Sequence, residues 1–428
     1  MDVLRAAFGL MFLVGVAYLF SLKRKSVDWR LVLTGITLQI VFGLLITQID
    51  FVRQAFNWIS RQFVVLLGFS GDGASFLFGS LMDTESLGFI FALQVLPTVI
   101  FFSTVTSGLY YLGVLQWIVK GIAWIMTRTM KLSGAESLSA AANIFLGQTE
   151  APLLVRPFVP KMTNSELMCL MTGGMATIAG GVLAGYVAFL GGGDPVAQER
   201  FAAYLLSASI MNAPAAIVMS KIMLPELNRD QINTDLTVSS DTMGVNLVDA
   251  LARGAAEGLK LALNIGAMLL AFIALIAAIN YILMALGDVT GLNAVIVSST
   301  DGSFDGFSLE YILGQFFRIF AFVIGVDWNE SLQVGSLLGQ KVVVNEFVAY
   351  LGLSEFVAAG ALNEKSIVIA TYALCGFANF SSIAIQIGGI GGMAPTQQGN
   401  ISKLGLRALF AATLATMMTA SIAGALMV

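Results

Sequence analysis

Residues 137–159 read SLSAAANIFLGQTEAPLLVRPFV. A polar, helix-breaking sequence, Gly147-Gln148-Thr149-Glu150-Ala151-Pro152, separates two mostly apolar arms of about ten residues each. As helix, each arm would span roughly 15 Å, which is half of a bilayer core of roughly 30 Å. The pattern therefore predicts a re-entrant helical hairpin. Its tip would place a carboxylate, an amide and a hydroxyl near the membrane midplane, where polar groups must face protein or a watery cavity.

A second hairpin of this kind is expected at residues 331–360, because the sequences around both copies correspond in order. A Glu-Ser-Leu triplet begins fourteen residues before Glu150 and sixteen residues before Glu346. The echoes are Glu136-Ser137-Leu138 with Glu330-Ser331-Leu332, and Tyr111-Leu112-Gly113 with Ile312-Leu313-Gly314. Broken hydrophobic segments at corresponding places in two halves indicate a transporter whose site lies between structural repeats.

The composition of the chain fixes its broad class. The 428 residues are 57% hydrophobic and only 11% charged, which predicts an all-α polytopic membrane protein in contact with lipid. The 44 glycines suit close packing of membrane helices. The net charge is −4 and no basic cluster is present, so nucleic acid is excluded as a partner.

Histidine is absent from the sequence, and the two cysteines lie inside apolar spans. The absence of histidine removes the usual zinc and haem ligands and the side chain best suited to proton relay near neutral pH. Any proton coupling would therefore fall to carboxylates. Cys169 and Cys375 are interpreted as small buried hydrophobic residues.

Hydropathy predicts eight transmembrane helices in addition to the two re-entrant hairpins. The predicted spans are 6–22, 31–49, 87–119, 167–190, 201–222, 261–286, 365–390 and 404–427. Two amphipathic stretches, 51–67 and 245–260, are predicted to lie along the membrane interface. These elements divide the chain into N-terminal scaffold spans at 1–86, a first repeat at 87–242 and a second repeat at 243–428.

The distribution of Lys and Arg predicts the orientation in the membrane. If the basic residues at 23–30 are cytoplasmic, alternation of the spans places fifteen of the 22 basic residues on that side. The loops at 191–198 and 287–308 contain none. Both termini are then external, and the two hairpins enter from opposite faces. This inverted topology is the arrangement that permits alternating access.

Four motifs resemble those of the concentrative nucleoside transporters, and together with the span order they cover nearly the whole chain. Residues 339–350 read GQKVVVNEFVAY, which is similar to that family's signature around an Asn-Glu-Phe-Val-Ala core. The other three are GQTEAP at 147–152, SKIMLPE at 220–226 and GFANFSS at 376–382, the last within the family's broken seventh span. The length is similar to that of the bacterial branch.

The resemblance implies a nucleoside site with a defined role for each residue. Gln148, Thr149 and Glu150 would face the nucleobase, and Val182 would pack against it. Glu346, Asn379 and Ser382 would hold the ribose hydroxyls, with Phe377 beside the sugar. Carboxylates suit a diol, because an ionised oxygen accepts short, strong hydrogen bonds from hydroxyls.

The resemblance also implies sodium as the co-transported ion. Its ligands would be the side-chain oxygens of Asn143 and Thr177 and the backbone carbonyls of Leu146 and Ile178. Thr177 stands where the family pattern has serine, and it keeps the hydroxyl. A bacterial inner-membrane location and a homotrimer are further implied.

The sequence leaves three other functions as alternatives. Proton-coupled nucleoside symport would use Glu150 or Glu346. An intramembrane aspartyl protease would need two aspartates inside spans, whereas Asp50, Asp249 and Asp327 fall at span ends or in amphipathic stretches. A channel fits less well than a transporter, because two closed tips describe an occluded site rather than a continuous pore. The sequence thus favours a transporter over an enzyme.

Overall fold

The computed structural model describes residues 2–88, 90–192, 194–228, 236 and 244–426, and within these residues every regular element is a helix. The all-helical class is therefore confirmed. The predicted boundary between the two repeats, at 242/243, and the last residue of the span 404–427 lie outside the described residues.

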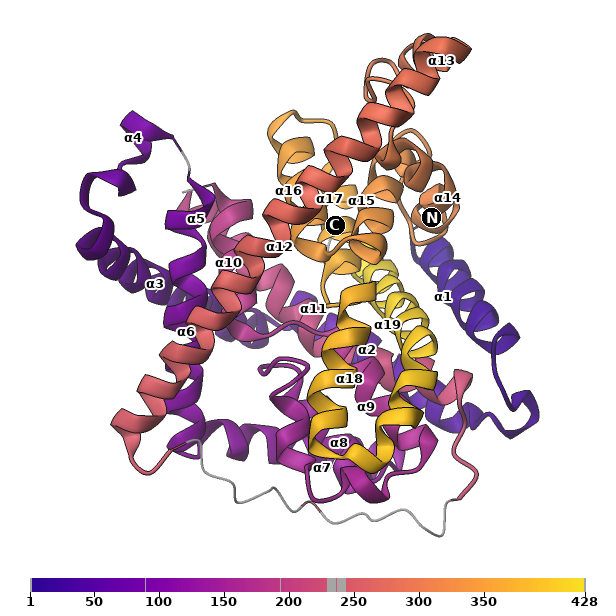
Figure 1. Cartoon of the computed structure of the whole chain (residues 1–428). Helices are drawn as coiled ribbons and strands as arrows, with labels where there is room; N and C mark the ends of the chain where they lie inside the picture. Colours follow the sequence, from indigo (N-terminus) through magenta and orange to yellow (C-terminus); the bar gives the residue numbers. More distant parts are fainter. Residues whose placement is uncertain (1, 89, 193, 229–235, 237–243, 427–428) are drawn as a thin grey trace.

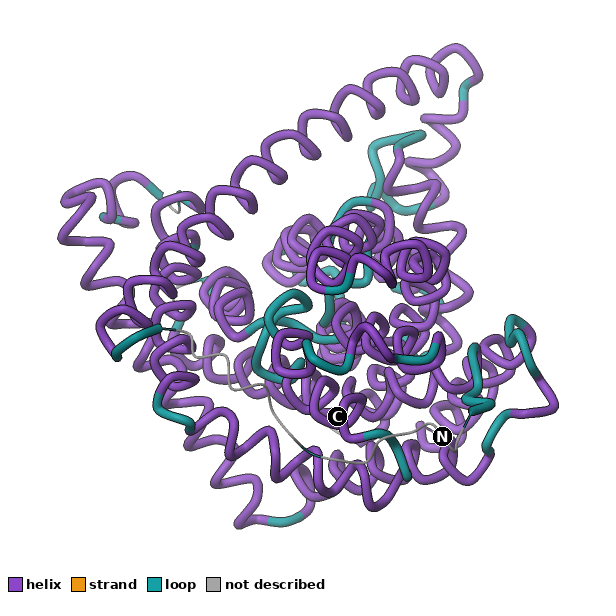
Figure 2. The backbone as a smooth tube through the Cα atoms, turned by 60° about the horizontal axis from the view of Figure 1, so that its bottom comes forward, coloured by secondary structure: helices purple, strands orange, loops and turns teal. Residues whose placement is uncertain are grey.

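Figure 2 shows the described helices and the loops that join them. The α-helices are α1 Asp2–Leu19, α2 Trp29–Gln48, α3 Asp50–Phe78, α4 Thr84–Leu87, α5 Phe91–Gln94, α6 Leu96–Tyr111, α7 Val114–Met130, α8 Gly134–Ala142, α9 Asn164–Ala176, α10 Gly180–Gly191, α11 Pro195–Met223, α12 Leu247–Thr290, α13 Leu292–Ser299, α14 Leu309–Val323, α15 Ser331–Val343, α16 Glu346–Ala358, α17 Glu364–Leu374, α18 Phe380–Met393 and α19 Gln398–Leu426. The 3-10 helices are η1 Arg24–Ser26, η2 Gly79–Met82, η3 Ala151–Val155, η4 Val159–Lys161 and η6 Pro395–Gln397.

Among the described residues, 8 helical stretches are long and apolar enough to cross a membrane. Seven of them correspond to predicted spans. The eighth, Asp50–Met82, contains the predicted interfacial stretch 51–67 and continues well beyond it. In Figure 1, α3 runs across the view, whereas α18 and α19 run up it. The predicted span 365–390 is instead divided into α17 and α18, as expected for a broken span.

Three predicted elements have the wrong bounds. The span 87–119 is not one helix, because α6 ends at Tyr111 and α7 begins at Val114. Gly113 between them has φ +81°, a left-handed conformation that ends a helix. Gly314 instead lies inside α14, so the echo between these two glycines does not mark equivalent structure.

The amphipathic stretch 245–260 and the span 261–286 are not separate elements either. They form the single 44-residue helix α12, because no Pro and no left-handed Gly interrupts them. Figures 1 and 2 show α12 as a long rod at the edge of the molecule. None of the residues in its most hydrophobic 18-residue segment is buried within the chain, which suits a surface in contact with lipid or another subunit.

The core is formed by the broken helix pair α9–α10 together with α11 and α19, the most buried of the membrane-length stretches. The pairs α11–α19, α9–α19 and α9–α11 pack against one another. The other broken pair, α17–α18, packs on α19. The two breaks in the helices therefore lie within the densest part of the molecule.

Both ends of the described chain lie on the same side of this core. Helix α1 is antiparallel to α19, because Gly9 approaches Ser421 whereas Arg407 donates a hydrogen bond to the carbonyl of Phe20. The start of α1 therefore lies beside the end of α19. This arrangement agrees with the prediction that both termini lie on one face of the membrane.

Helices α6 and α12 approach each other through small residues. A Cβ added at Gly258 would lie 2.7 Å from the Cα of Ile100, and one added at Gly254 would lie 2.6 Å from the Cβ of Ser107. Two glycines four residues apart let membrane helices pack closely, since lipid gives no hydrophobic drive for association. This contact positions one face of α12 over the cavity described below.

Candidate functional site

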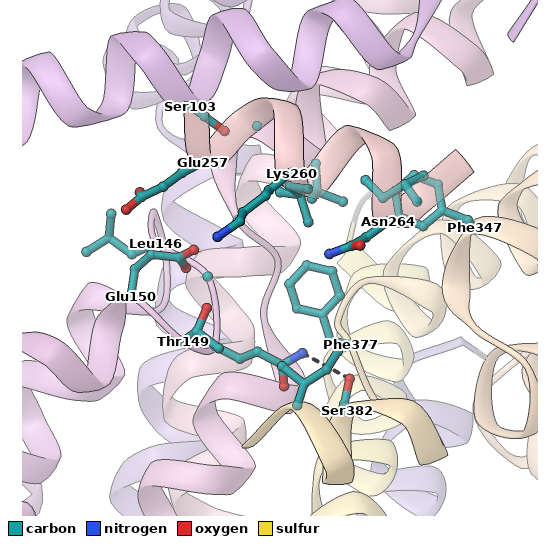
Figure 3. A pocket seen from close by; sticks show the side chains of 18 of the residues that line it. Ser103, Leu146, Thr149, Glu150, Glu257, Lys260, Asn264, Phe347, Phe377 and Ser382 are labelled. Carbon is teal, nitrogen blue, oxygen red and sulfur yellow. Dashed lines mark hydrogen bonds between the residues drawn. The ribbon is translucent and has the colours of Figure 1, made fainter. Parts of the chain in front are cut away.

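The helix breaks and the two polar tips meet around one cavity of about 530 Å³, shown in Figure 3. We call residues 143–150 the first tip and residues 344–346 the second tip. All eight residues predicted to bind substrate line the cavity. They are Gln148, Thr149, Glu150, Val182, Glu346, Phe377, Asn379 and Ser382. The volume is in the range of small-molecule sites.

The first tip is held in an irregular conformation by its own side chains. The α8 helix begins with a capping box, in which Ser133 and Glu136 each accept a hydrogen bond from the other's backbone N–H. It ends at Ala142, and the following residues form turns. Glu150 folds back over Gly147, where an added Cβ would lie 2.1 Å from its Oε2. Glycine is therefore required at 147 so that the glutamate can take this position.

The arm after the first tip differs from the prediction. It was expected to be helical over residues 153–159, but it forms only the 3-10 helices η3 and η4. The physical reason is the sequence of three prolines, Pro152, Pro157 and Pro160, each of which lacks the N–H that an α-helix needs.

The second tip is regular. Helices α15 and α16 are joined by Val344 and Asn345 alone, and the Asn345 side chain accepts a hydrogen bond from the N–H of Val348 at 2.9 Å. Asparagine is a favoured N-cap, so the Asn-Glu pair of the motif starts α16 and places Glu346 in its first turn. The carboxylate is then directed into the interior of the protein.

Glu346 is buried and both of its oxygens accept hydrogen bonds. The hydroxyl of Tyr186 donates to Oε1 at 2.8 Å, and the side-chain amide of Asn379 donates to Oε2 at 2.7 Å. The oxygen of the same Asn379 side chain caps α18 by accepting from the N–H of Ser382 at 2.9 Å. These contacts orient the carboxylate and leave it further lone pairs with which to accept from a ligand.

Gln148 connects the first tip to the second half of the chain. Its amide donates to the hydroxyl of Ser382 at 3.0 Å, and its oxygen accepts from the amide of Gln386 at 3.2 Å. Glu150 differs from Gln148, because its Oε2 is buried without a hydrogen-bond partner among the described residues. The cavity therefore holds an unsatisfied acceptor at the first tip and a satisfied carboxylate at the second.

The residues implied for sodium lie at one junction beside the cavity. The N–H of Gly180 donates to the carbonyl of Phe145 at 3.0 Å, which joins the first tip to the break between α9 and α10. Asn143, Thr177 and Ile178 are buried at this junction, and only Leu146 of the four also lines the cavity. The Oδ1 of Asn143 has no partner among the described residues. An unpaired buried oxygen is a group that a cation would satisfy.

No group of three or more Cys, Asp and Glu side chains that could hold a metal ion occurs in the part of the chain that the structure describes. The junction offers amide, hydroxyl and carbonyl oxygens instead. Hard cations prefer oxygen ligands, and a singly charged ion needs no excess of carboxylates. The donor set therefore fits a monovalent cation.

Sequence reasoning missed several residues that form the cavity. Helix α12 contributes Glu257, Lys260 and Asn264, and Figure 3 shows their side chains directed into the cavity. Their spacing of three and four residues in an apolar helix is a readable signal of one polar face. It was missed because the helix was divided at Lys260. Tyr186, which contacts Glu346 but is not among the residues that line the cavity, was also missed, although it lies four residues after Val182 on the same face of α10.

The aspartates named for the protease alternative do not line the cavity. Asp50 pairs with Arg53, Asp249 with Arg253, and Asp327 with Arg5. The cavity instead combines polar groups with apolar walls from Val182 and Phe377. Such a lining can bind a neutral molecule rich in hydroxyl, carbonyl and amide groups without adding net charge.

Comparisons with known proteins agree with this chemistry. Residues 8–81 match the N-terminus of the Na+ dependent nucleoside transporters, residues 92–193 match the family described as nucleoside recognition, and residues 204–424 match the C-terminus of the same transporters.

The similar proteins extend over the whole chain. An uncharacterized transporter of Bacillus subtilis, YutK, is 41% identical over 99% of this chain and 99% of its own. The mouse sodium/nucleoside cotransporter 1 is 40% identical over 95% of this chain, which spans 61% of that longer protein. The solved structure of CNTnw in an inward-facing substrate-bound state is 40% identical and covers 100% of this chain with a TM-score of 0.89. The chain therefore belongs to the family of Na+-dependent nucleoside transporters, bacterial members included, and is a multi-pass membrane protein.

Proposed function

We propose that this protein imports nucleosides such as uridine together with sodium, by alternating access of the cavity to the two sides of the membrane. Gln148, Thr149 and Glu150 bind the nucleobase against Val182, and Glu346, Asn379 and Ser382 bind the ribose beside Phe377. The observation that carries this proposal is the buried carboxylate of Glu346, which is oriented by Tyr186 and Asn379 at the wall of a cavity of suitable size.

The chemistry of a nucleoside supports this assignment. A nucleoside is neutral, so its transfer from water depends on replacing hydrogen bonds rather than on pairing charge. An oriented carboxylate accepts bonds from a diol, whereas amides such as Gln148 both donate and accept, as a base edge requires. The two tips therefore divide the ligand between a base side and a sugar side.

Sodium coupling is supported by the junction of Asn143, Leu146, Thr177 and Ile178. The first tip contributes Asn143 and Leu146, and the break in the α9–α10 pair contributes the other two. A cation bound there would hold the tip against the broken helix and so stabilise the nucleobase side of the cavity. Binding of either ligand would then favour binding of the other.

The hairpins are proposed to be re-entrant and to enter from opposite faces in an inverted repeat. The first hairpin starts near the end of α1, because Glu136 pairs with Lys221 and Met223 accepts a hydrogen bond from the N–H of Leu22. The second hairpin starts near the beginning of α1, because Asp327 pairs with Arg5 at 3.2 Å. Opposite entry from the two ends of one helix supports the inverted arrangement.

We also propose a bacterial inner-membrane location with both termini external, and assembly as a homotrimer. The asymmetry of basic residues between loops supports the orientation. The exposed apolar length of α12 supports contact with lipid or with other subunits.

The test is uptake of radiolabelled uridine by proteoliposomes that contain the purified protein. We expect uptake in an inward sodium gradient and little uptake when choline replaces sodium at constant ionic strength and pH. An excess of unlabelled nucleoside is expected to compete, and free uracil, which lacks the ribose, is expected to compete poorly.

Two results would contradict the proposal in different ways. Uptake that ignores sodium and follows a pH gradient would replace sodium by the proton and leave the nucleoside assignment intact. Sodium-dependent currents without uridine uptake, or with equal competition by uracil, would remove the proposed ribose contacts. Liposomes without protein provide the background.

A further inference from the structure

Both helix breaks expose backbone carbonyls inside the protein. Helix α9 ends at Ala176 and helix α17 ends at Leu374, and neither can continue its hydrogen-bond ladder across the break. Asn212 on α11 serves both, since its side-chain amide donates to the carbonyls of Ala176 at 2.8 Å and Cys375 at 3.2 Å. One amide cannot satisfy all the carbonyls, so each junction needs a further positive group or donor.

We call the place where α17 breaks beside the second hairpin the second junction. Its surroundings resemble those of the first junction, between the first tip and the α9–α10 break. At the first, the hydroxyl of Ser209 on α11 donates to the carbonyl of Ile144 at 3.0 Å, next to Asn143. At the second, the hydroxyl of Thr416 on α19 accepts a hydrogen bond from Lys341 at 3.0 Å. In each half, a hydroxyl on a long core helix therefore contacts the hairpin, within the tip in the first half and three residues before the tip in the second.

The junctions differ in the group at their centre. At the first, no lysine or arginine of the described residues donates a hydrogen bond, and Asn143 leaves its Oδ1 unpaired. The second holds the ammonium of Lys341, which donates to the carbonyl of Ala373 at 2.8 Å as well as to Thr416. Lys341 is only 1% exposed. Among the described residues no carboxylate forms an ion pair with it.

The ligands of Lys341 are therefore those expected for a small cation: a backbone carbonyl at a helix break and a threonine hydroxyl. We propose that the Lys341 ammonium is a resident cation that takes, at the second junction, the place that sodium takes at the first. This proposal rests on the proposed function. It implies that one sodium, and not two, accompanies each nucleoside.

The charges near the tips support a single exchangeable ion. Glu346 lies five residues after Lys341 on the same hairpin and interacts electrostatically with its ammonium. That carboxylate therefore has a covalently attached positive charge nearby, although the two groups form no ion pair. The charge that acts on Glu150 at the first tip is instead the like charge of Glu257, and a bound sodium would supply the opposite charge. One tip is therefore organised permanently, and the other is organised only when the ion is present.

The test counts sodium ions in the wild-type protein and in variants of Lys341. Labelled sodium and labelled uridine are added outside the proteoliposomes, and the uptake of both is counted. We expect the wild type to take up about one sodium per uridine, with a Hill coefficient for sodium of about 1. Lys341→Ser removes the ammonium and leaves space and a hydroxyl, so a second sodium is expected to bind. The Hill coefficient should then rise to about 2, with about two sodium ions per uridine.

Two controls separate the removal of charge from the opening of a site. Lys341→Met fills the space without oxygens, and it should weaken uridine binding while the Hill coefficient stays near 1. Lys403→Ser removes an exposed lysine of α19 and should change neither quantity.

The outcomes are distinct even if a variant does not fold. Two sodium ions per uridine in the wild type would overturn the resident cation and leave sodium symport intact. A folded Lys341→Ser protein with one sodium per uridine would also overturn it, as would a second sodium in Lys341→Met. Uridine uptake without sodium would overturn sodium coupling, and this inference with it, and would leave nucleoside transport intact.

Discussion

The two tips of this transporter differ in how they hold their polar groups inside the protein. The second tip is a compact turn between two regular helices, capped by Asn345 and followed by a carboxylate with two bound donors. The first tip is irregular for eight residues, returns through 3-10 helices and leaves acceptors on Asn143 and Glu150 unpaired among the described residues. The difference indicates that the second tip is preorganised, whereas the first needs ligands to complete it.

The bases of the two hairpins also differ. Glu136 and Lys221 form a buried pair with side chains 1% and 7% exposed, and Lys221 also donates to the hydroxyl of Ser165 at 2.9 Å. At the other base, Asp327 is 57% exposed in its pair with Arg5. The irregular first tip therefore belongs to the hairpin whose ion pair is buried. Removing that pair should reduce the stability of the protein more than removing the exposed pair.

The largest effect is expected at the buried base. Glu136→Gln leaves the ammonium of Lys221 buried without its counter-charge, which should destabilise the protein by about 3–5 kcal/mol. The measurement is thermal unfolding of the purified protein in detergent. A change no greater than that of the exposed pair would show that the two hairpin bases contribute equally to stability.

The next effect is expected at the preorganised tip. Glu346→Gln replaces a charge-assisted acceptor and should weaken uridine binding by about 1.5–3 kcal/mol, measured by calorimetry. Glu355→Gln is the matched control, because Glu355 is an exposed carboxylate on the same helix α16. Unchanged affinity in Glu346→Gln, with the protein folded, would remove this residue from the site.

A smaller effect is expected at the ion junction of the first tip. Thr177→Val keeps the shape and deletes one oxygen, so the half-saturating sodium concentration for uridine uptake should rise about fivefold, or about 1 kcal/mol. Thr172→Val is the matched control: both hydroxyls are buried and donate to the carbonyl four residues back, Thr172 at 2.7 Å and Thr177 at 2.9 Å. Equal behaviour of the two variants would mean that Thr177 is an ordinary helix residue.

The smallest effect is expected at the exposed base. Asp327→Asn removes the charge that faces Arg5, yet solvent screens this pair and Arg5 also donates to the carbonyls of Phe322 and Val326. The loss of stability should stay below about 1 kcal/mol in the same thermal assay. A loss equal to that of Glu136→Gln would mean that the second hairpin depends on its base as strongly as the first.

Much of the candidate site could be predicted, because its residues carry local signals. Glu150, Glu346 and Asn379 are polar groups in apolar segments, and each stands beside a helix end that the chain itself makes. The ends of α12 could not be placed correctly, because a Lys at position 260 resembles the end of an interfacial segment. In the structure α12 continues through Lys260, and Gly254 and Gly258 pack its first part on α6.

The sequence by itself determined the all-helical membrane class and the two polar tips, and its resemblance to a family implied the break in the seventh span. Hydropathy, prolines, glycines and N-caps act over a few residues, so these features are written locally. The tertiary structure alone decided that Tyr186 orients Glu346, 160 residues away, and that Lys341 reaches the carbonyl of Ala373, 32 residues away. Such contacts depend on how whole helices pack, and no spacing along the chain encodes them directly.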